Sequence, residues 1–237
     1  MSQTALWVIQ QAEMELGLPV SPVMAGSNEA TATQLQALLN SAGYELSSNY
    51  QWEELNRDYI FDTVDGQDSY DLPDDYNYFI DSTGWDRSNR WPLLGPVSQQ
   101  EWQAVVAWKV KAVLRTYYKV QNKQITFFPA ITSIRQMALS YASKNWVTSG
   151  IAPFAPKDMI DQDGDLMVLN PWLMVKLLKV KMWGAKGFDT SMLAMEFTTM
   201  WNSLTAKSKG NRVLSLAPQT GTILIGTQNI PPGGFGY

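Results

Sequence analysis

Residues 171–186 read PWLMVKLLKVKMWGAK, and this stretch decides the fold. Proline suits the first turn of a helix, and Gly187 ends the helical pattern. Apolar side chains recur at helical spacing along two adjoining rows, at Leu173, Leu177 and Val180 and at Met174, Leu178 and Met182. We predict that Lys176, Lys179 and Lys186 lie on the polar face. The wide apolar face of this helix requires partner helices.

Three further segments have the same period. Residues 5–16 form a predicted helix with Thr4 as N-cap and Gly17 as its end, and a second helix starts near Ser27 or Asn28 and runs to Leu46. A third follows a cap at Asp189, with an apolar row at Leu193, Phe197, Met200 and Leu204. Since each of these helices has an apolar face, we expect the N-terminal and C-terminal helices to pack together.

The sequence between the helices has the two-residue period of strands. We predict a hairpin of residues 59–64 and 69–72 around Asp65-Gly66, a second of residues 79–85 and 91–94, and a third of residues 116–120 and 125–128. A strand follows at 137–147 and a loop at 149–165. Ser98 and Glu101 form a capping box that predicts one helix, near residues 98–111.

The predicted fold class is α+β. Residues 1–57 hold the N-terminal helices of a bundle, 58–165 an inserted antiparallel β-rich domain, 166–210 the C-terminal helices of the bundle, and 211–237 an extended docking tail. The tail ends in Ile-Pro-Pro-Gly-Gly-Phe-Gly-Tyr, which is too rich in glycine and proline to fold alone.

The composition argues against an enzyme. The chain has no histidine and no cysteine, so it lacks the most common general base and metal ligand and cannot form a thiolate site. Asp161, Asp163 and Asp165 surround Gly164, but they lack the spacing and the closing glutamate of a calcium loop. We therefore expect no catalytic, cofactor-binding or metal-binding residues.

The charge is unevenly distributed along the sequence. Residues 1–100 carry three basic and fifteen acidic side chains, whereas residues 101–237 carry fifteen basic and seven acidic ones. This asymmetry would let the acidic part of one copy face the basic part of another, or both parts are simply solvated. The candidate partner-binding residues are Lys176, Lys179, Lys186, Lys207, Lys209, Arg212, Phe235 and Tyr237. We also expect no membrane span and no signal peptide.

Four collinear motifs resemble those of the head-to-tail adaptor proteins of tailed bacteriophages. They are residues 66–75 (GQDSYDLPDD), 85–93 (WDRSNRWPL), the pair 127–130 and 141–147 (FFPA and YASKNWV), and 182–189 (MWGAKGFD). The sequence departs from the family pattern at Gly184, where a larger residue is usual, and at Thr190, where tyrosine is usual.

The resemblance implies a structural role related to that of the tail tubular protein A of short-tailed phages. Such a protein forms a twelve-fold ring that joins the portal to a tail nozzle or tube in the virion, after assembly in the host cytoplasm. Genomic DNA passes through the ring without sequence-specific binding. Two alternatives stay open: another neck or tail protein, such as a head-completion or tail-terminator protein, and a metal-dependent DNA-processing enzyme.

Overall fold

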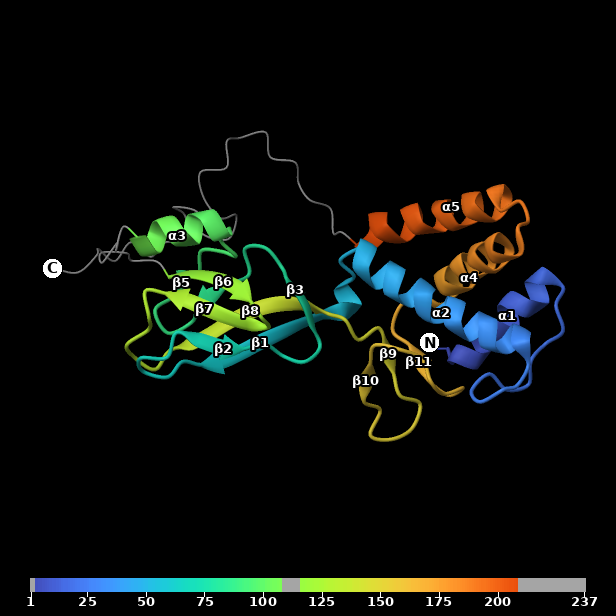
Figure 1. Ribbon diagram of the computed structural model, residues 1–237, viewed down its shortest axis with the longest axis horizontal. Helices are drawn as coiled ribbons and strands as arrows, with labels where there is room; N and C mark the ends of the chain where they lie inside the picture. The colour runs from blue at the N-terminus through green and yellow to red at the C-terminus, as the bar shows by residue number, and fades with distance from the viewer. Residues whose placement is uncertain (1–2, 108–115, 209–237) are drawn as a thin grey trace.

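The computed structural model describes residues 3–107 and 116–208. A helical part and a β part lie end to end in an elongated molecule, joined where α2 is followed by β1 and where β8 is followed by β9 (Figure 1). Helices and antiparallel sheets are both present, so the predicted α+β class is confirmed.

The helical part contains α1 (Ala5–Leu16), α2 (Ala30–Asn49), α4 (Pro171–Lys186) and α5 (Ser191–Ser208). The expected starts of α1 and α4 are confirmed by their caps: the Thr4 hydroxyl accepts the Trp7 N–H at 3.2 Å, and the Asn170 carbonyl oxygen accepts those of Trp172 and Leu173. Gly187 ends α4 in the left-handed conformation (φ 78°), which favours glycine. The helix expected from Ser27 or Asn28 begins later, at Ala30.

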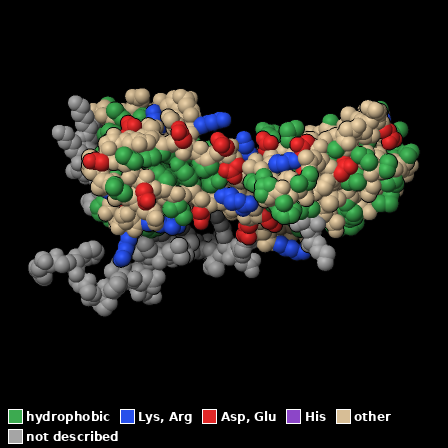
Figure 2. All heavy atoms as spheres, turned by 90° about the horizontal axis from the view of Figure 1, so that it is seen from below, with side chains coloured by type: hydrophobic (Ala, Val, Ile, Leu, Met, Phe, Trp, Pro, Cys, Tyr) green, Lys and Arg blue, Asp and Glu red, His purple; other side chains and the backbone are tan. Residues whose placement is uncertain are grey.

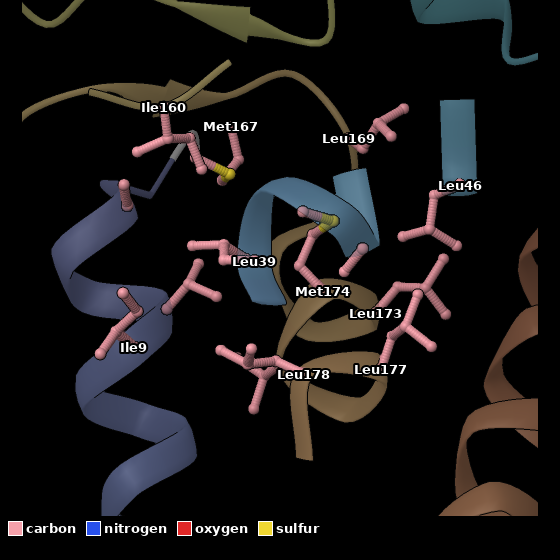
Figure 3. Packing of buried hydrophobic residues seen from close by; sticks show 14 of the residues in the cluster. Ile9, Leu39, Leu46, Ile160, Met167, Leu169, Leu173, Met174, Leu177 and Leu178 are labelled. Atoms are coloured by element: carbon pink, nitrogen blue, oxygen red, sulfur yellow. The ribbon is translucent and has the colours of Figure 1, made fainter. Parts of the chain in front are cut away.

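Helix α4 is the centre of the helical core. Leu173, Met174 and Leu178 are fully buried, and α1, α2 and α5 all pack against α4. Figure 3 shows the α4 side chains pointing toward Ile9 of α1 and Leu39 of α2. The apolar face read from residues 171–186 therefore lies between helices that come from both ends of the sequence.

The segment after β8 also belongs to the helical core, which differs from the predicted domain boundary at 165. Strands β9 (Val147–Thr148), β10 (Pro156–Lys157) and β11 (Leu166–Met167) form a small antiparallel sheet in the order β10-β9-β11. Ile160 and Met167 point into the core beside α1 (Figure 3). These apolar residues lie in two short runs, 159–160 and 166–169, that are separated by acidic and polar residues and have neither a helical nor an alternating period, so the sequence pattern does not show that they are buried.

The β part has two sheets. Its elements are β1 (Asn56–Asp62), which follows a short 3-10 turn (Glu53–Leu55), β2 (Ser69–Asp71), β3 (Tyr76–Phe79), β4 (Trp85–Asp86), β5 (Trp91–Pro92), α3 (Gln99–Ala107), β6 (Tyr117–Gln121), β7 (Gln124–Phe128) and β8 (Gln136–Ser143). Strand β8 is buried on both faces and lies centrally, with β1 on one side and β3 and β4 on the other. The other sheet has the order β2-β7-β6.

The hairpin predicted around Asp65-Gly66 is wrong, although the turn is present. Gly66 has φ 78°, and the Gln67 N–H donates to the Val64 carbonyl at 3.1 Å. The flanking strands nevertheless pair elsewhere, β1 with β8 and β2 with β7. Tyr70 explains the divergence, because its ring packs between Phe61 and Phe127 and so holds β2 over the core rather than beside β1.

The other predicted pairings agree with the structure. Strands β6 and β7 pair as expected, and β4 pairs with β5 through Trp85–Pro92 and Asp86–Trp91. The continuous strand expected at 79–85 is wrong, because β3 ends at Phe79 and β4 begins only at Trp85, with no strand between them. The capping box is confirmed: the Glu101 N–H donates to Ser98 Oγ at 3.2 Å and the Ser98 N–H to Glu101 Oε2 at 2.9 Å. Helix α3 is described to Ala107, and its expected end near 111 lies outside the described residues.

Candidate functional site

The lysines of α4 mostly connect helices within the protomer. Lys179 is only 5% exposed, so its predicted place on a polar face is wrong. Its Nζ lies 2.5 Å from Glu15 Oε2 on α1 and 3.7 Å from Glu196 Oε2 on α5. Because α1 and α5 both cover α4, Lys179 projects between them and neutralises a carboxylate from each.

Lys176 and Lys181 repeat this arrangement. Lys176 Nζ donates to Glu196 Oε2 at 2.9 Å, and this hydrogen bond lowers the pKa of Glu196. Lys181 Nζ lies 2.6 Å from Glu45 Oε2 on α2. Lys176 is therefore bonded to α5 and Lys181 to α2, which leaves fewer lysines for a partner than the sequence suggested.

Two candidate lysines remain available. Lys186, in the last turn of α4, and Lys207, in the last turn of α5, are exposed and make no ion pair with any residue that the structure describes. The other four candidates, Lys209, Arg212, Phe235 and Tyr237, lie outside the described residues.

The outer helix α5 presents an apolar groove. It packs against the core through Phe197, Met200, Trp201 and Leu204, yet none of its residues is fully buried. Beside this packed face, a groove of about 510 Å³ is lined by seven residues of α4 and α5: Lys176, Met192, Met195, Glu196, Thr199, Met200 and Ser203. Met192 and Met195 are 73% and 68% exposed, so the groove is a candidate contact surface.

A second apolar surface lies at the tip of the loop between β9 and β10. Ile151, Phe154 and nearby Met159 are all more than half exposed. The sequence pattern predicts only a loop at residues 149–165 and does not by itself indicate an exposed apolar surface. Three large apolar residues in a short stretch with Pro153 and Pro156 were the available signal.

The aspartates considered as a calcium loop instead hold this segment together and fasten it to the loop between α1 and α2. Asp165 is fully buried, and its carboxylate accepts hydrogen bonds from Lys157 Nζ at 2.9 and 3.0 Å and from the N–H groups of Asp161 and Gln162. The Asp163 carboxylate accepts the N–H groups of Met24 and Ala25 at 3.0 and 2.7 Å. The carboxylates of Asp163 and Asp165 thus both accept hydrogen bonds, and these bonds hold the loop in place.

Five exposed aspartates follow one edge of the β part. They are Asp58, Asp62, Asp65, Asp68 and Asp71, and they lie on β1, on β2 and in the turn between these strands. Tyr59 of β1 donates its hydroxyl to the Asp71 carbonyl at 2.7 Å, so these outer strands of two different sheets come close to each other without pairing. We call this row the acidic edge.

The uneven charge along the sequence does not make one of the two parts of the molecule acidic and the other basic. The acidic first hundred residues and the basic remainder both contribute to each part, and ion pairs such as Arg135–Asp86, Lys179–Glu15 and Lys181–Glu45 join them. Figure 2 shows acidic and basic side chains interspersed along the molecule. These ion pairs therefore neutralise part of the uneven charge within a single protomer.

Two of the four motifs that resemble phage adaptors, residues 66–75 and 141–147, contact each other in the β part. Asp75 of residues 66–75 accepts the Tyr141 hydroxyl at 2.8 Å and the Ser143 hydroxyl at 2.7 Å. Burial, followed by the hydrogen bond with Asp75, raises the pKa of Tyr141 to about 12, so this hydroxyl keeps its proton at neutral pH. These motifs therefore build the β part rather than a binding site.

The two departures from the motif pattern also lie together. A Cβ atom added at Gly184 would lie 3.9 Å from Thr190 Cγ2. The residue at 184 is thus smaller than usual opposite a position that is also smaller than usual, and an alanine at 184 would make an ordinary van der Waals contact with Thr190.

Comparison with known proteins identifies the family. Residues 3–161 match the family described as SU10 adaptor protein, a range that covers α1, α2 and the β part but ends before α4 and the fourth motif. No curated protein matches the chain. None of the described helices is both long and apolar enough to span a membrane. Adaptor families are typically made of non-enzymatic virion proteins that associate with other head and tail proteins, and this chain belongs to the SU10 adaptor protein family of phage structural proteins.

Proposed function

We propose that the chain is a subunit of a twelve-fold ring that joins the portal to the tail nozzle or tube and surrounds the passing DNA, a role similar to that of tail tubular protein A. The observation that carries this proposal is the family match over residues 3–161, which spans elements of both parts of the molecule. The role of the ring is to hold other proteins around a channel rather than to do chemistry.

The placement of the exposed apolar surfaces supports a ring. A closed ring of identical copies needs head-to-tail contacts, in which one surface of a copy meets a different surface of the next. The outer side of α5, a helix with no fully buried residue, and the loop tip at Ile151 and Phe154 are two such surfaces on separate elements of the helical part. Both are apolar enough to be covered in an assembly.

The decisive experiment mixes the purified chain with the purified portal and measures mass by mass photometry, followed by electron microscopy. We expect twelve copies bound in a ring beneath each portal. A chain that binds only a completed head or only a tail end would instead be a head-completion or tail-terminator protein. Magnesium-dependent cleavage of DNA, without binding to the portal, would support the enzyme alternative.

We propose that the remaining candidate residues contact partners in this assembly. Lys186 and Lys207 are exposed and unpaired among the described residues, and Phe235 and Tyr237 are aromatic anchors of the kind that dominate interfaces. Lys209 and Arg212 lie between Lys207 and Phe235 in the sequence and supply further positive charge. A chain that ends at residue 229 lacks Phe235 and Tyr237. We expect this chain to lose attachment to its partner protein while its contacts with neighbouring copies in the ring remain.

Reversing the charge of the acidic edge should slow DNA ejection. An acidic wall repels the duplex and lets it slide, whereas lysines would bind phosphates and release counterions. We expect particles with Asp62→Lys, Asp65→Lys and Asp68→Lys to eject DNA more slowly than the parent, most clearly at low salt. The measurement is the ejection rate followed with a DNA-binding dye.

A matched control carries the same charge change elsewhere. Glu29→Lys, Glu53→Lys and Glu54→Lys alter three exposed glutamates of the helical part and its border. These particles should eject at the parental rate. Equal ejection rates for the parent and both triple variants would show that the acidic edge does not face the channel.

A further inference from the structure

The groove along α5 has a defined shape and chemistry. Met192, Met195, Thr199 and Ser203 follow one another at intervals of three or four residues, which places them in one row on the helix. Lys176 and Glu196 close one end of the surface with a hydrogen bond of 2.9 Å, so they neutralise each other. The row is about 16 Å long, from the 1.5 Å rise per helical residue, with the two methionines at one end and the short polar side chains of Thr199 and Ser203 toward the other.

Nothing in the described part of the chain covers this row. The residues of α5 that pack on the core, Phe197, Trp201 and Leu204, lie on another face of the helix. Exposed methionine side chains that line a groove adapt readily to an apolar partner. The occupant must therefore come from residues 209–237 or from another molecule.

The sequence that follows α5 fits the groove. The helix ends at Ser208, and residues 209–237 contain only two charged side chains, Lys209 and Arg212. Gly210-Asn211 is a pair that favours a chain reversal. The first apolar residues after it are Val213, Leu214 and Leu216.

The reach of this segment agrees with the length of the groove. Thr199 lies nine residues before Ser208, or about 13 Å back along the helix axis. An extended chain advances about 3.3 Å per residue, so about four residues after a reversal at Gly210-Asn211 are enough to return to Thr199. That places Leu214 opposite the middle of the groove.

We propose that residues 211–219 of the same chain fold back along α5 and cover the groove, with Leu214 against Thr199, Leu216 against Met195 and the residues after it reaching Met192. The inference goes beyond the proposed ring and does not depend on it, because it concerns a single chain. It leaves residues 230–237 free to reach a partner.

The absence of cysteine from the chain makes a disulfide test clean. Thr199→Cys combined with Leu214→Cys should form an intramolecular disulfide in high yield under mild oxidation, seen as a faster band on a non-reducing gel. Thr198 provides a matched control. It is also exposed and also donates its hydroxyl to the carbonyl four residues earlier, but it lies about 100° around the helix and outside the groove.

The expected result is a several-fold higher yield of intramolecular disulfide for the Thr199 pair than for Thr198→Cys with Leu214→Cys. Equal yields for the two pairs would overturn the proposal. A disulfide-linked dimer as the main product of the Thr199 pair would also overturn it and would assign the groove to the tail of a second copy.

Methionine oxidation supplies a second readout that needs no new cysteine. In the intact chain, Met192 and Met195 should react with peroxide several-fold more slowly than in a chain ending at residue 208, measured by mass spectrometry. Met14 and Met159, which are 51% and 55% exposed elsewhere, should react alike in both chains. Identical rates for Met192 and Met195 in both chains would contradict the proposal, whatever becomes of the ring.

Discussion

We expect Trp146→Ala to lower the free energy of unfolding by about 3–5 kcal/mol, the usual cost of deleting a large buried side chain. Trp146 is 1% exposed and lies in the helical core just after β8, where the chain passes from the β part into the helical part. Its ring rests directly on the backbone of α2 at Gly43, and a Cβ atom added there would lie 2.2 Å from the indole. The measurement is urea unfolding followed by far-UV circular dichroism, which does not depend on tryptophan emission.

Trp91→Ala is the matched control, because Trp91 is 40% exposed in the short strand β5. It should cost far less than Trp146→Ala, since Trp91 already has 40% of its surface in water whereas Trp146 has 1%. Similar costs for the two substitutions would show that Trp146 is not the packed anchor that the structure describes.

The same contact makes Gly43→Ala unusually costly for an alanine in a helix. Alanine normally stabilises a helix by about 1 kcal/mol relative to glycine, but here the added methyl group forces the buried indole to move, at about 1–3 kcal/mol. In a Trp146→Ala background the clash disappears, so Gly43→Ala should become neutral or stabilising. Simple additivity of the two single changes would refute this coupling.

Asp165→Ala should lower the free energy of unfolding by roughly 3 kcal/mol, because it removes one partner from a buried ion pair. Lys157 would keep Asp161, which places the cost at the lower end of the usual range. The N–H groups of Asp161 and Gln162 would lose their acceptor as well. Asp158→Ala, at an exposed pair whose atoms are 4.0 Å apart, is the control and should change stability very little.

Asp165 also predicts the direction of a pH effect. Burial alone raises the pKa of this carboxyl group, but the hydrogen bonds from Lys157 and two backbone N–H groups outweigh it, and the pKa lies below its ordinary value of 3.8. The unfolded chain therefore binds the proton more readily, so the stabilisation is present above about pH 4 and is lost as the pH falls through the folded pKa. Asp165→Asn should show a shallower loss of stability in acid than the parent, and parallel curves would exclude this role.

The contacts of buried polar residues were the part of the candidate site that the sequence predicted least well. Lys179 had the spacing of a solvent-facing lysine, but its closest partner, Glu15, lies on α1 at the other end of the sequence, and the packing of α1 and α5 on α4 buries it. Likewise, Asp161, Asp163 and Asp165 looked like one cluster, yet Asp163 binds the backbone near Met24 and Asp165 binds Lys157. A local pattern shows which side chains are charged, not which distant group is brought beside them.

The sequence by itself determined the features that depend on neighbours within a few residues. The helices at 5–16 and 171–186, their caps at Thr4 and Asn170, the Ser98–Glu101 capping box and the pairing of β6 with β7 all follow from local spacing and turn chemistry. The α+β class and the phage adaptor family follow from those elements and the motifs they carry.

Only the tertiary structure decided which strands pair across a long separation and which charges stay free. The turn at Asp65-Gly66 is the same whether β1 pairs with β2 or with β8, and the burial of Tyr70 against Phe61 and Phe127 selects the second arrangement. Ion pairs between its two halves neutralise part of the charge asymmetry read along the chain. Burial and charge pairing are properties of the packed molecule, because they depend on the chain being brought together in space.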